Sequence, residues 1–215
     1  MTNNVITKDI YLNIIKIDYP VNPSKNAYFC KRDPNIVDTL VIHHTAEPKD
    51  HGPQEINRVA IETRQTRGEP WYMLGYNYMI SERDHGGSSQ DHAIIEGRPP
   101  EMQGAHTEGY TRKLSSQRKD ELEKYNIECG RDGNFSKKNL LSVLKDGKIK
   151  GNITSIGIAI LGNYEQRSTK NIGGIIIPKN AQGSKDVVYP SDTVIEKVAK
   201  LACKLQRQYP NIKRI

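Results

Sequence analysis

The sequence predicts an α/β protein in which a central mixed β-sheet is flanked by helices. Short apolar segments rich in β-branched residues are typical of buried strands, and they occur at 39–42, 75–80, 93–96 and 156–161. Two other segments, 53–68 and 191–209, place apolar residues at helical spacing. Strands and helices that are mixed in this order, in a chain of 215 residues, favour one domain in which helices cover a sheet.

Each predicted helix has its own start and end signals. The first begins at Gly52-Pro53, because proline suits the first helical turn, and it ends near Gly68. The second takes Ser191 or Asp192 as its cap and ends before Pro210. Its apolar stripe consists of Val194, Val198, Leu201 and Leu205. Both helices are expected to pack on the sheet through their apolar sides.

The rest of the chain divides into a leading segment and loops. Residues 1–38 are predicted to be a separate N-terminal segment, in which the apolar run 10–17 either adds an edge strand or lies across the domain as an arm. Residues 39–215 form the main domain. Within it we predict loops at 83–90 and 166–185, where residues such as Gly, Ser and Asn are frequent.

The stretch 110–151 concentrates the positive charge of the chain. It holds eleven Lys or Arg against six Asp or Glu and so contributes +5 of the formal net charge of +7. Two pieces of it have a helical pattern, one from Ser116 to about Ile127 and one from Ser136 onward. The charge has two open interpretations, a solvated surface or a contact with an anionic polymer.

Composition narrows the classes of partner. A net charge of +7 favours nucleic acid, a membrane surface or the anionic polymers of a bacterial wall. Nucleic acid is unlikely as a partner, since the sequence has no zinc-finger spacing, no RNA-binding aromatic motif and no basic helical repeat. No apolar run approaches the length of a membrane span, and residues 1–8 lack the apolar core of a secretory signal.

The three cysteines, Cys30, Cys129 and Cys203, are predicted to be free thiols. Their odd number and wide spacing do not fit a disulfide framework and suit a reducing compartment.

The strand at 39–42 ends in His43-His44, and His43 is the first candidate for chemistry. A side chain at the end of a strand is held on a rigid element, as a catalytic or metal-binding group must be. Histidine is a common metal ligand and equally a common hydrogen-bonded polar residue, so the strand alone leaves both interpretations open.

Five blocks follow one another in a fixed order along the chain. They are Ile-His-His-Thr-Ala at 42–46, Gly-Tyr-Asn-Tyr-Met-Ile at 75–80, Glu-Gly-Arg at 96–98, Gly-Ala-His-Thr at 104–107 and Asn-Ile-Thr-Ser-Ile-Gly-Ile-Ala-Ile-Leu-Gly-Asn at 152–163. In this order the blocks resemble the zinc-dependent N-acetylmuramoyl-L-alanine amidases and the peptidoglycan recognition proteins. The resemblance covers most of 39–215, and 110–151 is an insertion relative to the family pattern.

The resemblance implies a fold, a reaction and a set of site residues. It implies the amidase fold and hydrolysis of the peptidoglycan amide between N-acetylmuramic acid and L-alanine by a zinc-activated water. His43 would be a zinc ligand, and Tyr76 would hydrogen-bond the reacting centre, where a phenol O–H can stabilise a developing oxyanion. For Tyr76, a core tyrosine is the alternative.

Four further residues match positions that line the substrate groove of the family. They are Thr45, Arg98, His106 and Asn152. His106 would contact the substrate rather than the metal. Arg98 would pair with a stem-peptide carboxylate or, as an equal alternative, form a structural salt bridge.

The other two zinc ligands of the family, a His and then a Cys or Asp, follow its last helix. This sequence ends at Ile215, about where that block begins, so we expect the remaining ligands beyond Ile215. The alternative is a catalytically inactive module that binds peptidoglycan without them. Because residues 1–8 lack a secretory signal, we expect the protein to stay in the cytoplasm until release and then to act at the cell wall, as an endolysin does.

Overall fold

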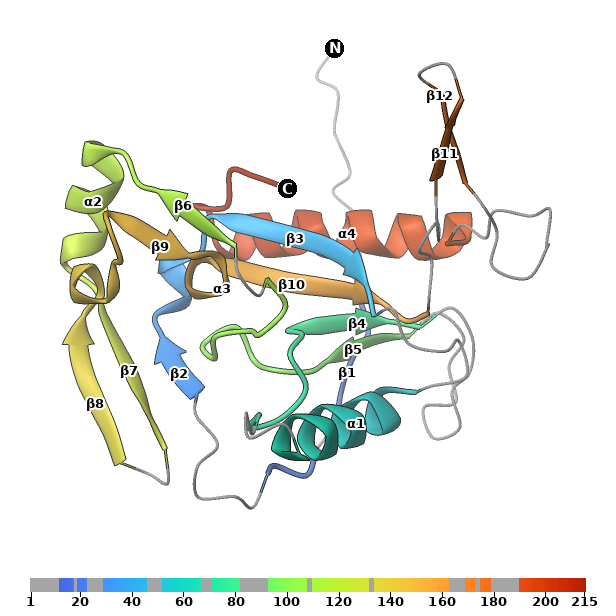
Figure 1. The fold of residues 1–215 in the computed structure, drawn as a ribbon, viewed down its shortest axis with the longest axis horizontal. Helices are drawn as coiled ribbons and strands as arrows, with labels where there is room; N and C mark the ends of the chain where they lie inside the picture. Colours follow the sequence, from blue (N-terminus) through green and yellow to red (C-terminus); the bar gives the residue numbers. More distant parts are fainter. Residues whose placement is uncertain are drawn as a thin grey trace, which may run out of the picture.

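The computed structural model describes residues 12–17, 19–22, 29–45, 52–66, 71–81, 93–107, 110–131, 134–162, 169–172, 175–178 and 190–215, with the backbone alone for 63–66, 169–172 and 175–178. At its centre is a five-stranded sheet in the order β1-β5-β4-β10-β3 (Figure 1). The strands are β1 (Ile14–Lys16), β3 (Thr39–His44), β4 (Tyr78–Ile80), β5 (Ile94–Glu96) and β10 (Ser155–Ile160).

The sheet mixes parallel and antiparallel pairs, which confirms the predicted fold class. β10 lies between β3 and β4 and is parallel to both. β5 is antiparallel to β4, and β1 is parallel to β5 at the edge of the sheet. Within the run 10–17, residues 14–16 therefore form the edge strand, whereas residues 10 and 11 lie outside the described residues.

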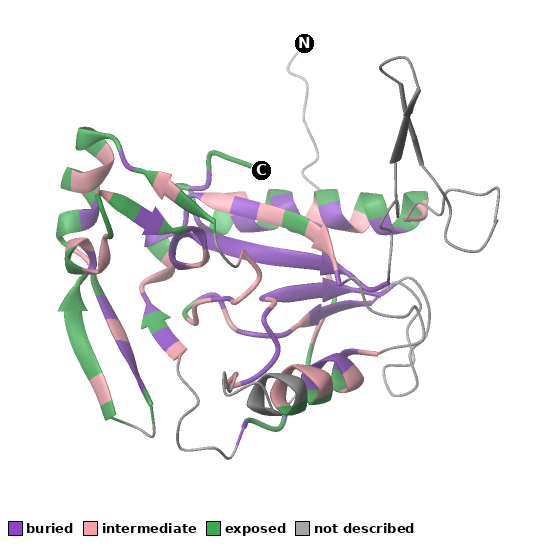
Figure 2. Cartoon of the chain, viewed as in Figure 1, coloured by how far each residue is buried: buried purple, intermediate pink, exposed green. Residues whose placement is uncertain are grey.

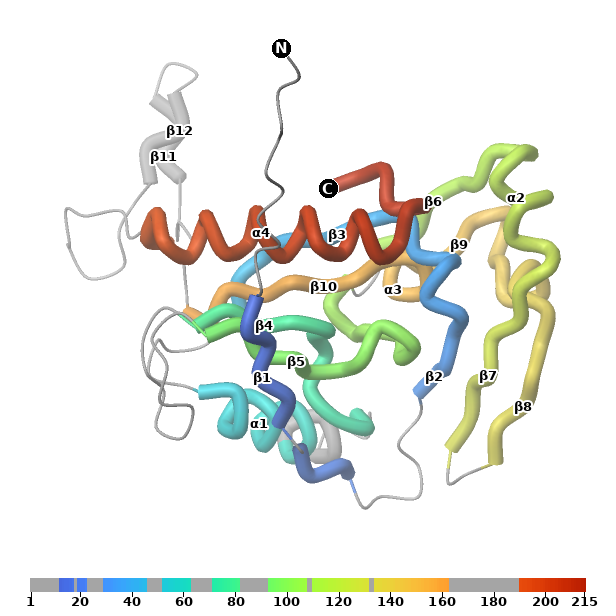
Figure 3. The backbone as a smooth tube through the Cα atoms, turned by 180° about the vertical axis from the view of Figure 1, so that it is seen from behind, coloured from blue at the N-terminus to red at the C-terminus, as the bar shows by residue number. Residues whose placement is uncertain are grey.

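The two predicted helices cover opposite faces of this sheet. α1 (Pro53–Thr66) begins at the predicted proline, and α4 (Asp192–Gln208) is capped by Ser191, whose Oγ accepts a hydrogen bond from the amide of Val194. α4 passes behind β3 in Figure 1 and in front of it in the reversed view of Figure 3. The α4 face and the α1 face bury separate hydrophobic clusters.

β10 contributes to both clusters, because successive side chains of a strand point to opposite faces. Ile156, Ile158 and Ile160 pack beneath α4 together with its apolar stripe. Ala159 belongs to the cluster on the α1 side, with Ile56 of α1. Every residue of β10 is buried, as its colour in Figure 2 shows, so the predicted central strand is confirmed.

In the predicted insertion, 110–151, β7 (Asn126–Arg131) pairs with β8 (Asn134–Asn139) and with β2 (Phe29–Arg32) of the N-terminal segment, which gives a separate three-stranded sheet. The other elements of 110–151 are β6 (Thr111–Lys113), α2 (Ser116–Glu123), the 3-10 turn η2 (Leu140–Val143) and β9 (Lys148–Lys150), and the single turn α3 (Gly151–Thr154) then leads into β10. A further 3-10 turn, η1 (Pro34–Ile36), precedes β3.

Two expectations about the insertion need correction. The helix from Ser116 ends at Glu123 rather than near Ile127, and the helix predicted from Ser136 does not form, because Ser136 lies in β8. The physical reason is tertiary. β2, far away in sequence, supplies an edge on which β7 pairs, and strand pairing of this kind overrides a short local helical pattern.

The prediction of three free thiols is wrong for two of them. Cys30 and Cys129 stand opposite each other in the β2–β7 register, and their sulfur atoms are bonded. Cys203 on α4 is free and exposed. Cys30 and Cys129 meet only because β2 and β7 pair, which the spacing does not reveal. The cysteines therefore no longer support a reducing compartment.

The predicted loop 166–185 is also partly wrong, since β11 (Thr169–Ile172) and β12 (Ile175–Pro178) form an antiparallel pair within it. The predicted loop 83–90 lies outside the described residues. None of the helices in the described part of the chain is long and apolar enough to cross a membrane.

Candidate functional site

Three aromatic side chains converge on the α1 face of the sheet. The ring of His43, near the end of β3, lies 4.9 Å from the ring of Tyr76 and 5.5 Å from the ring of His106, measured between centroids. Tyr76 comes just before β4, and His106 lies in the segment that follows β5. Three blocks of the predicted motif therefore meet at one place.

Glycine makes the room that His106 occupies. A Cβ atom on Gly157 of β10 would lie 2.5 Å from Cγ and Cδ2 of the His106 ring, and one on Gly104 would lie 2.4 Å from Cδ2. Such distances are well inside van der Waals contact, so neither position accepts a side chain unless the ring moves. The small residue in the middle of an Ile-rich strand is what allows an imidazole to lie on the sheet.

Asn152 fixes the backbone that carries His106. Its Oδ1 accepts hydrogen bonds from the amides of His106 (3.0 Å) and Thr107 (2.8 Å) and from the Thr107 hydroxyl (2.8 Å). On the other side, Oγ of Ser155 lies 3.4 Å from Nε2 of His106. One amide oxygen thus holds three donors of a loop, which is a positioning role.

Both imidazoles are neutral at physiological pH. Burial and the neighbouring His44 lower the pKa of His43 to about 4. Burial, followed by the charges of His43, Arg32 and Arg98, lowers the pKa of His106 to about 3. Nε2 of His43 and Nδ1 of His106 are buried and have no hydrogen-bond partner among the described residues. A neutral imidazole with such a nitrogen is the form in which histidine binds a metal.

The described residues fit a zinc ion in part. His43 has the buried, unpartnered nitrogen that a ligand needs. However, the described residues contain no group of three or more His, Cys, Asp or Glu side chains that could hold a metal ion, whereas a catalytic zinc usually takes three protein ligands. His43 could therefore supply one ligand, but the described residues do not supply a full set.

A groove runs beside the loop of His106. It consists of two pockets, of about 220 Å³ and 130 Å³, which share Trp71, Gln103, Ala105 and Asn152. Thr107 and Tyr110 line the larger pocket. His43 and Tyr76 line neither pocket, so the ring cluster lies next to the groove rather than on its walls. An indole, a phenol and several amide groups make a surface suited to sugars and peptides.

Arg98 is buried, and the protein itself uses all of its guanidinium nitrogens. Nε donates to the carbonyl of Leu74, Nη1 to that of Gln103 and Nη2 to that of Met73, at 2.6 to 2.8 Å. Burial lowers its pKa to about 10. In this arrangement Arg98 braces the residues that line the groove through backbone carbonyls, and it forms no ion pair among the described residues, so neither a carboxylate partner nor the predicted structural salt bridge is seen there.

Thr45 is likewise buried at the end of β3. Its hydroxyl donates to the carbonyl of Gly162 (3.2 Å) and accepts from the amide of Gly162 (3.1 Å), which joins the ends of β3 and β10. Of the six predicted site residues, the structure brings His43, Tyr76, His106 and Asn152 together, and it gives Arg98 and Thr45 bracing contacts.

Sequence analysis named no candidate residue in 1–38 and so missed Arg32. This arginine is buried, and its Nη1 donates to the carbonyls of Asn152 (2.7 Å) and Ile153 (2.6 Å) while Nε donates to that of Pro100 (3.0 Å). Arg32 therefore holds the backbone of Asn152 in place. Local sequence gives no sign of this, since an arginine that stands between a lysine and an aspartate, as Arg32 does, is ordinary.

A sequence model of the N-acetylmuramoyl-L-alanine amidase family matches residues 32–215, which is most of the chain. The chain belongs to this family. Residues 32–38 lie inside the match, so the matched region begins before the boundary at 39 that we predicted from sequence.

Among solved structures, the endolysin from Thermus scotoductus MAT2119 bacteriophage Ph2119 is similar, with 16% identity, coverage of 94% of this chain and 82% of that one, and a TM-score of 0.42. Bumblebee PGRP-SA has 17% identity, coverage of 93% and 77%, and a TM-score of 0.44. A Drosophila PGRP-LB mutant in complex with tracheal cytotoxin has 14% identity, coverage of 93% and 77%, and a TM-score of 0.42. A search of curated proteins found no match.

Proposed function

We propose that this amidase-family protein binds bacterial peptidoglycan and hydrolyses the amide between N-acetylmuramic acid and the first L-alanine of the stem peptide by a zinc-activated water. The observation that carries the proposal is the cluster of His43, Tyr76 and His106 beside a groove. The proposed place of action is the cell wall, reached after release of the protein from the cytoplasm.

Each residue has a role in this proposal. His43 contributes its unpartnered Nε2 as one ligand. Zinc, when bound, lowers the pKa of a water molecule and polarises the scissile carbonyl. The ring of Tyr76 lies next to that of His43, and its hydroxyl donates a hydrogen bond to the carbonyl oxygen, on which negative charge develops. His106 contacts the substrate, and Asn152 keeps the loop of His106 in place.

The test measures new α-amino groups released from purified peptidoglycan and identifies N-terminal alanine among them. We expect His43→Ala and Tyr76→Phe each to lower the rate by about 100-fold or more, as the loss of a ligand or of an oxyanion donor does. Tyr125→Phe, a half-buried tyrosine of the insertion, is the matched control and should keep the rate. Full activity in both site variants would refute the proposal.

A second candidate function is recognition without catalysis. It is favoured by the incomplete set of metal ligands in the described ranges. In that case the chain sediments with insoluble peptidoglycan, a zinc chelator does not change the bound fraction, and no α-amino groups appear. Elemental analysis of zinc in the wild type and in His43→Ala separates the two functions. The hydrolase requires about one zinc ion per chain in the wild type and loss of that ion in the variant, whereas recognition alone requires neither.

A further inference from the structure

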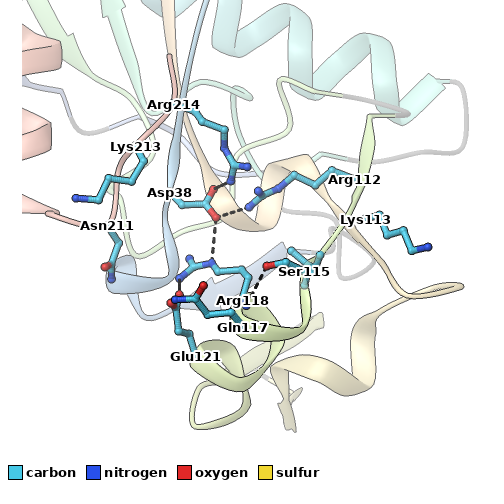
Figure 4. Close-up of a pocket in the computed structure, with 11 residues that line it drawn as sticks. Asp38, Arg112, Lys113, Ser115, Gln117, Arg118, Glu121, Asn211, Lys213 and Arg214 are labelled. Atoms are coloured by element: carbon cyan, nitrogen blue, oxygen red, sulfur yellow. Dashed lines mark hydrogen bonds and ion pairs between the residues drawn. The ribbon is translucent and has the colours of Figure 1, made fainter.

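A third pocket, of about 470 Å³, lies where residues 112–121 meet the start of β3 and the C-terminal segment after α4 (Figure 4). Asp38, immediately before β3, is at its centre, so the pocket is at the opposite end of β3 from His43. The charged side chains lining it are five cations against two carboxylates, a net charge of +3: Arg112, Lys113, Arg118, Lys213 and Arg214 against Asp38 and Glu121.

The buried carboxylate of Asp38 orders the three arginines that line the pocket. Asp38 is almost fully buried, with a side chain 6% exposed. Its Oδ2 accepts from Arg112 and from Nε of Arg118 (3.2 Å), and its Oδ1 accepts from Arg214 (2.8 Å). Arg118 also pairs with Glu121 (2.7 Å), so two carboxylates face three guanidinium groups, and Asp38 holds all three in fixed positions. Side chains that are already ordered lose little entropy when an anion binds.

Some of the ordered donors remain available to a ligand. Among the contacts of the described residues, Arg112 uses only Nη2, for Asp38 and the hydroxyl of Thr154. Arg214 uses Nε and Nη2, for Thr39 and Asp38. Arg112 therefore keeps Nε and Nη1, and Arg214 keeps Nη1.

Two exposed lysines add mobile charge around this ordered centre. Lys113 and Lys213 are exposed and form no ion pair within the described part of the chain. Figure 4 shows them on opposite sides of Asp38, with their ammonium groups directed away from it. Fixed guanidinium forks flanked by flexible ammonium groups are the donor set that suits phosphate, because the fork matches its oxygens and the lysines add point charge.

We propose that this pocket binds phosphate groups of a phosphodiester polymer of the bacterial wall. β6 connects it to the groove, since Thr111 lines the groove while Arg112 and Lys113 line the basic pocket. A wall polymer can therefore be held while peptidoglycan occupies the groove. The choice of a wall polymer rests on the proposed function. Single-stranded nucleic acid is disfavoured, because no aromatic side chain lines the pocket for bases to stack on.

The experiment measures the Kd of the chain for fluorescently labelled poly(glycerol phosphate) by anisotropy. The test variant is Lys113→Glu/Lys213→Glu, and the matched control is Lys138→Glu/Lys204→Glu, in which two exposed lysines outside the pocket make the same change in net charge. We expect the test variant to bind about tenfold more weakly and the control about twofold more weakly, because contact charges count for more than distant, screened ones.

Other outcomes overturn the proposal. They are equal weakening in both variants, absence of binding by the wild type, or tighter binding of single-stranded DNA with the same number of phosphates. Inorganic phosphate is titrated as a competitor, and displacement of the polymer at an equal concentration of phosphate groups would mean that the site takes free phosphate instead. His43→Ala must bind the polymer like the wild type, so a failure of the hydrolase proposal is recognised separately from a failure of this one.

Discussion

The two faces of β10 carry side chains of different size: large aliphatic residues on the α4 face and small residues on the α1 face. On the α4 face, Ile156, Ile158 and Ile160 fill a continuous aliphatic core. On the α1 face, Gly157 and Ala159 leave space, and the ring of His106 lies over Gly157. One face of the strand therefore contributes to stability, whereas the small residues of the other face leave room for the imidazole of His106.

The largest expected effect on stability comes from the α4 face. Ile158→Ala should lower the free energy of unfolding by about 2–5 kcal/mol, because the fully buried side chain leaves a cavity beneath α4. Urea denaturation measures this loss. Peptidoglycan binding by the folded fraction should be unchanged, and a large loss of binding would show that the two faces are not separable.

Gly157→Ala should lower the free energy of unfolding less than Ile158→Ala does, but it should weaken peptidoglycan binding more. The added Cβ would meet the His106 ring at 2.5 Å, so the ring must move, at a cost of about 1–3 kcal/mol. Peptidoglycan sedimentation should show weaker binding. Ile158→Val is the control, since it removes one methyl from the opposite face for about 0.5–1.5 kcal/mol. Equal binding by Gly157→Ala and the control would contradict the division between the faces.

The last of the three predictions concerns the segment that carries His106, whose ring lies over Gly157. Asn152→Ala leaves two amides and one hydroxyl without their acceptor and should cost about 1–3 kcal/mol, less where water replaces the lost oxygen. Hydrogen exchange of the amides of His106 and Thr107 should accelerate. Asn152→Asp keeps an acceptor oxygen and should exchange more slowly than the alanine variant. If exchange is the same in the wild type and Asn152→Ala, Asn152 does not hold the loop.

The sequence was sufficient to predict the elements whose pattern lies within a single segment of the chain. The stripe of α4, with Val194, Val198, Leu201 and Leu205, matches its buried face, and the apolar run of β10 matches its central place. The order of motif blocks also predicted which side chains meet, since His43, Tyr76 and His106 come from three such blocks.

The sequence was insufficient where a contact depends on distant segments. Ser136 was assigned to a helix because its strand partner, β7, and the further partner β2 leave no mark in the local pattern. The bond between Cys30 and Cys129 has the same cause. Arg98 matched a groove position, but its contacts with three backbone carbonyls depend on how the loops around it fold.

The position of β10 between β3 and β4 has a consequence for the order in which the protein can fold during synthesis. β3 and β4 both leave the ribosome before their shared neighbour, so their facing edges stay unpaired until residues 155–160 follow. Unpaired edges are open to pairing with other chains. The sheet therefore closes only after residues 155–160 have been made, and nascent chains that stall before residue 155 are the ones we expect chaperones to hold.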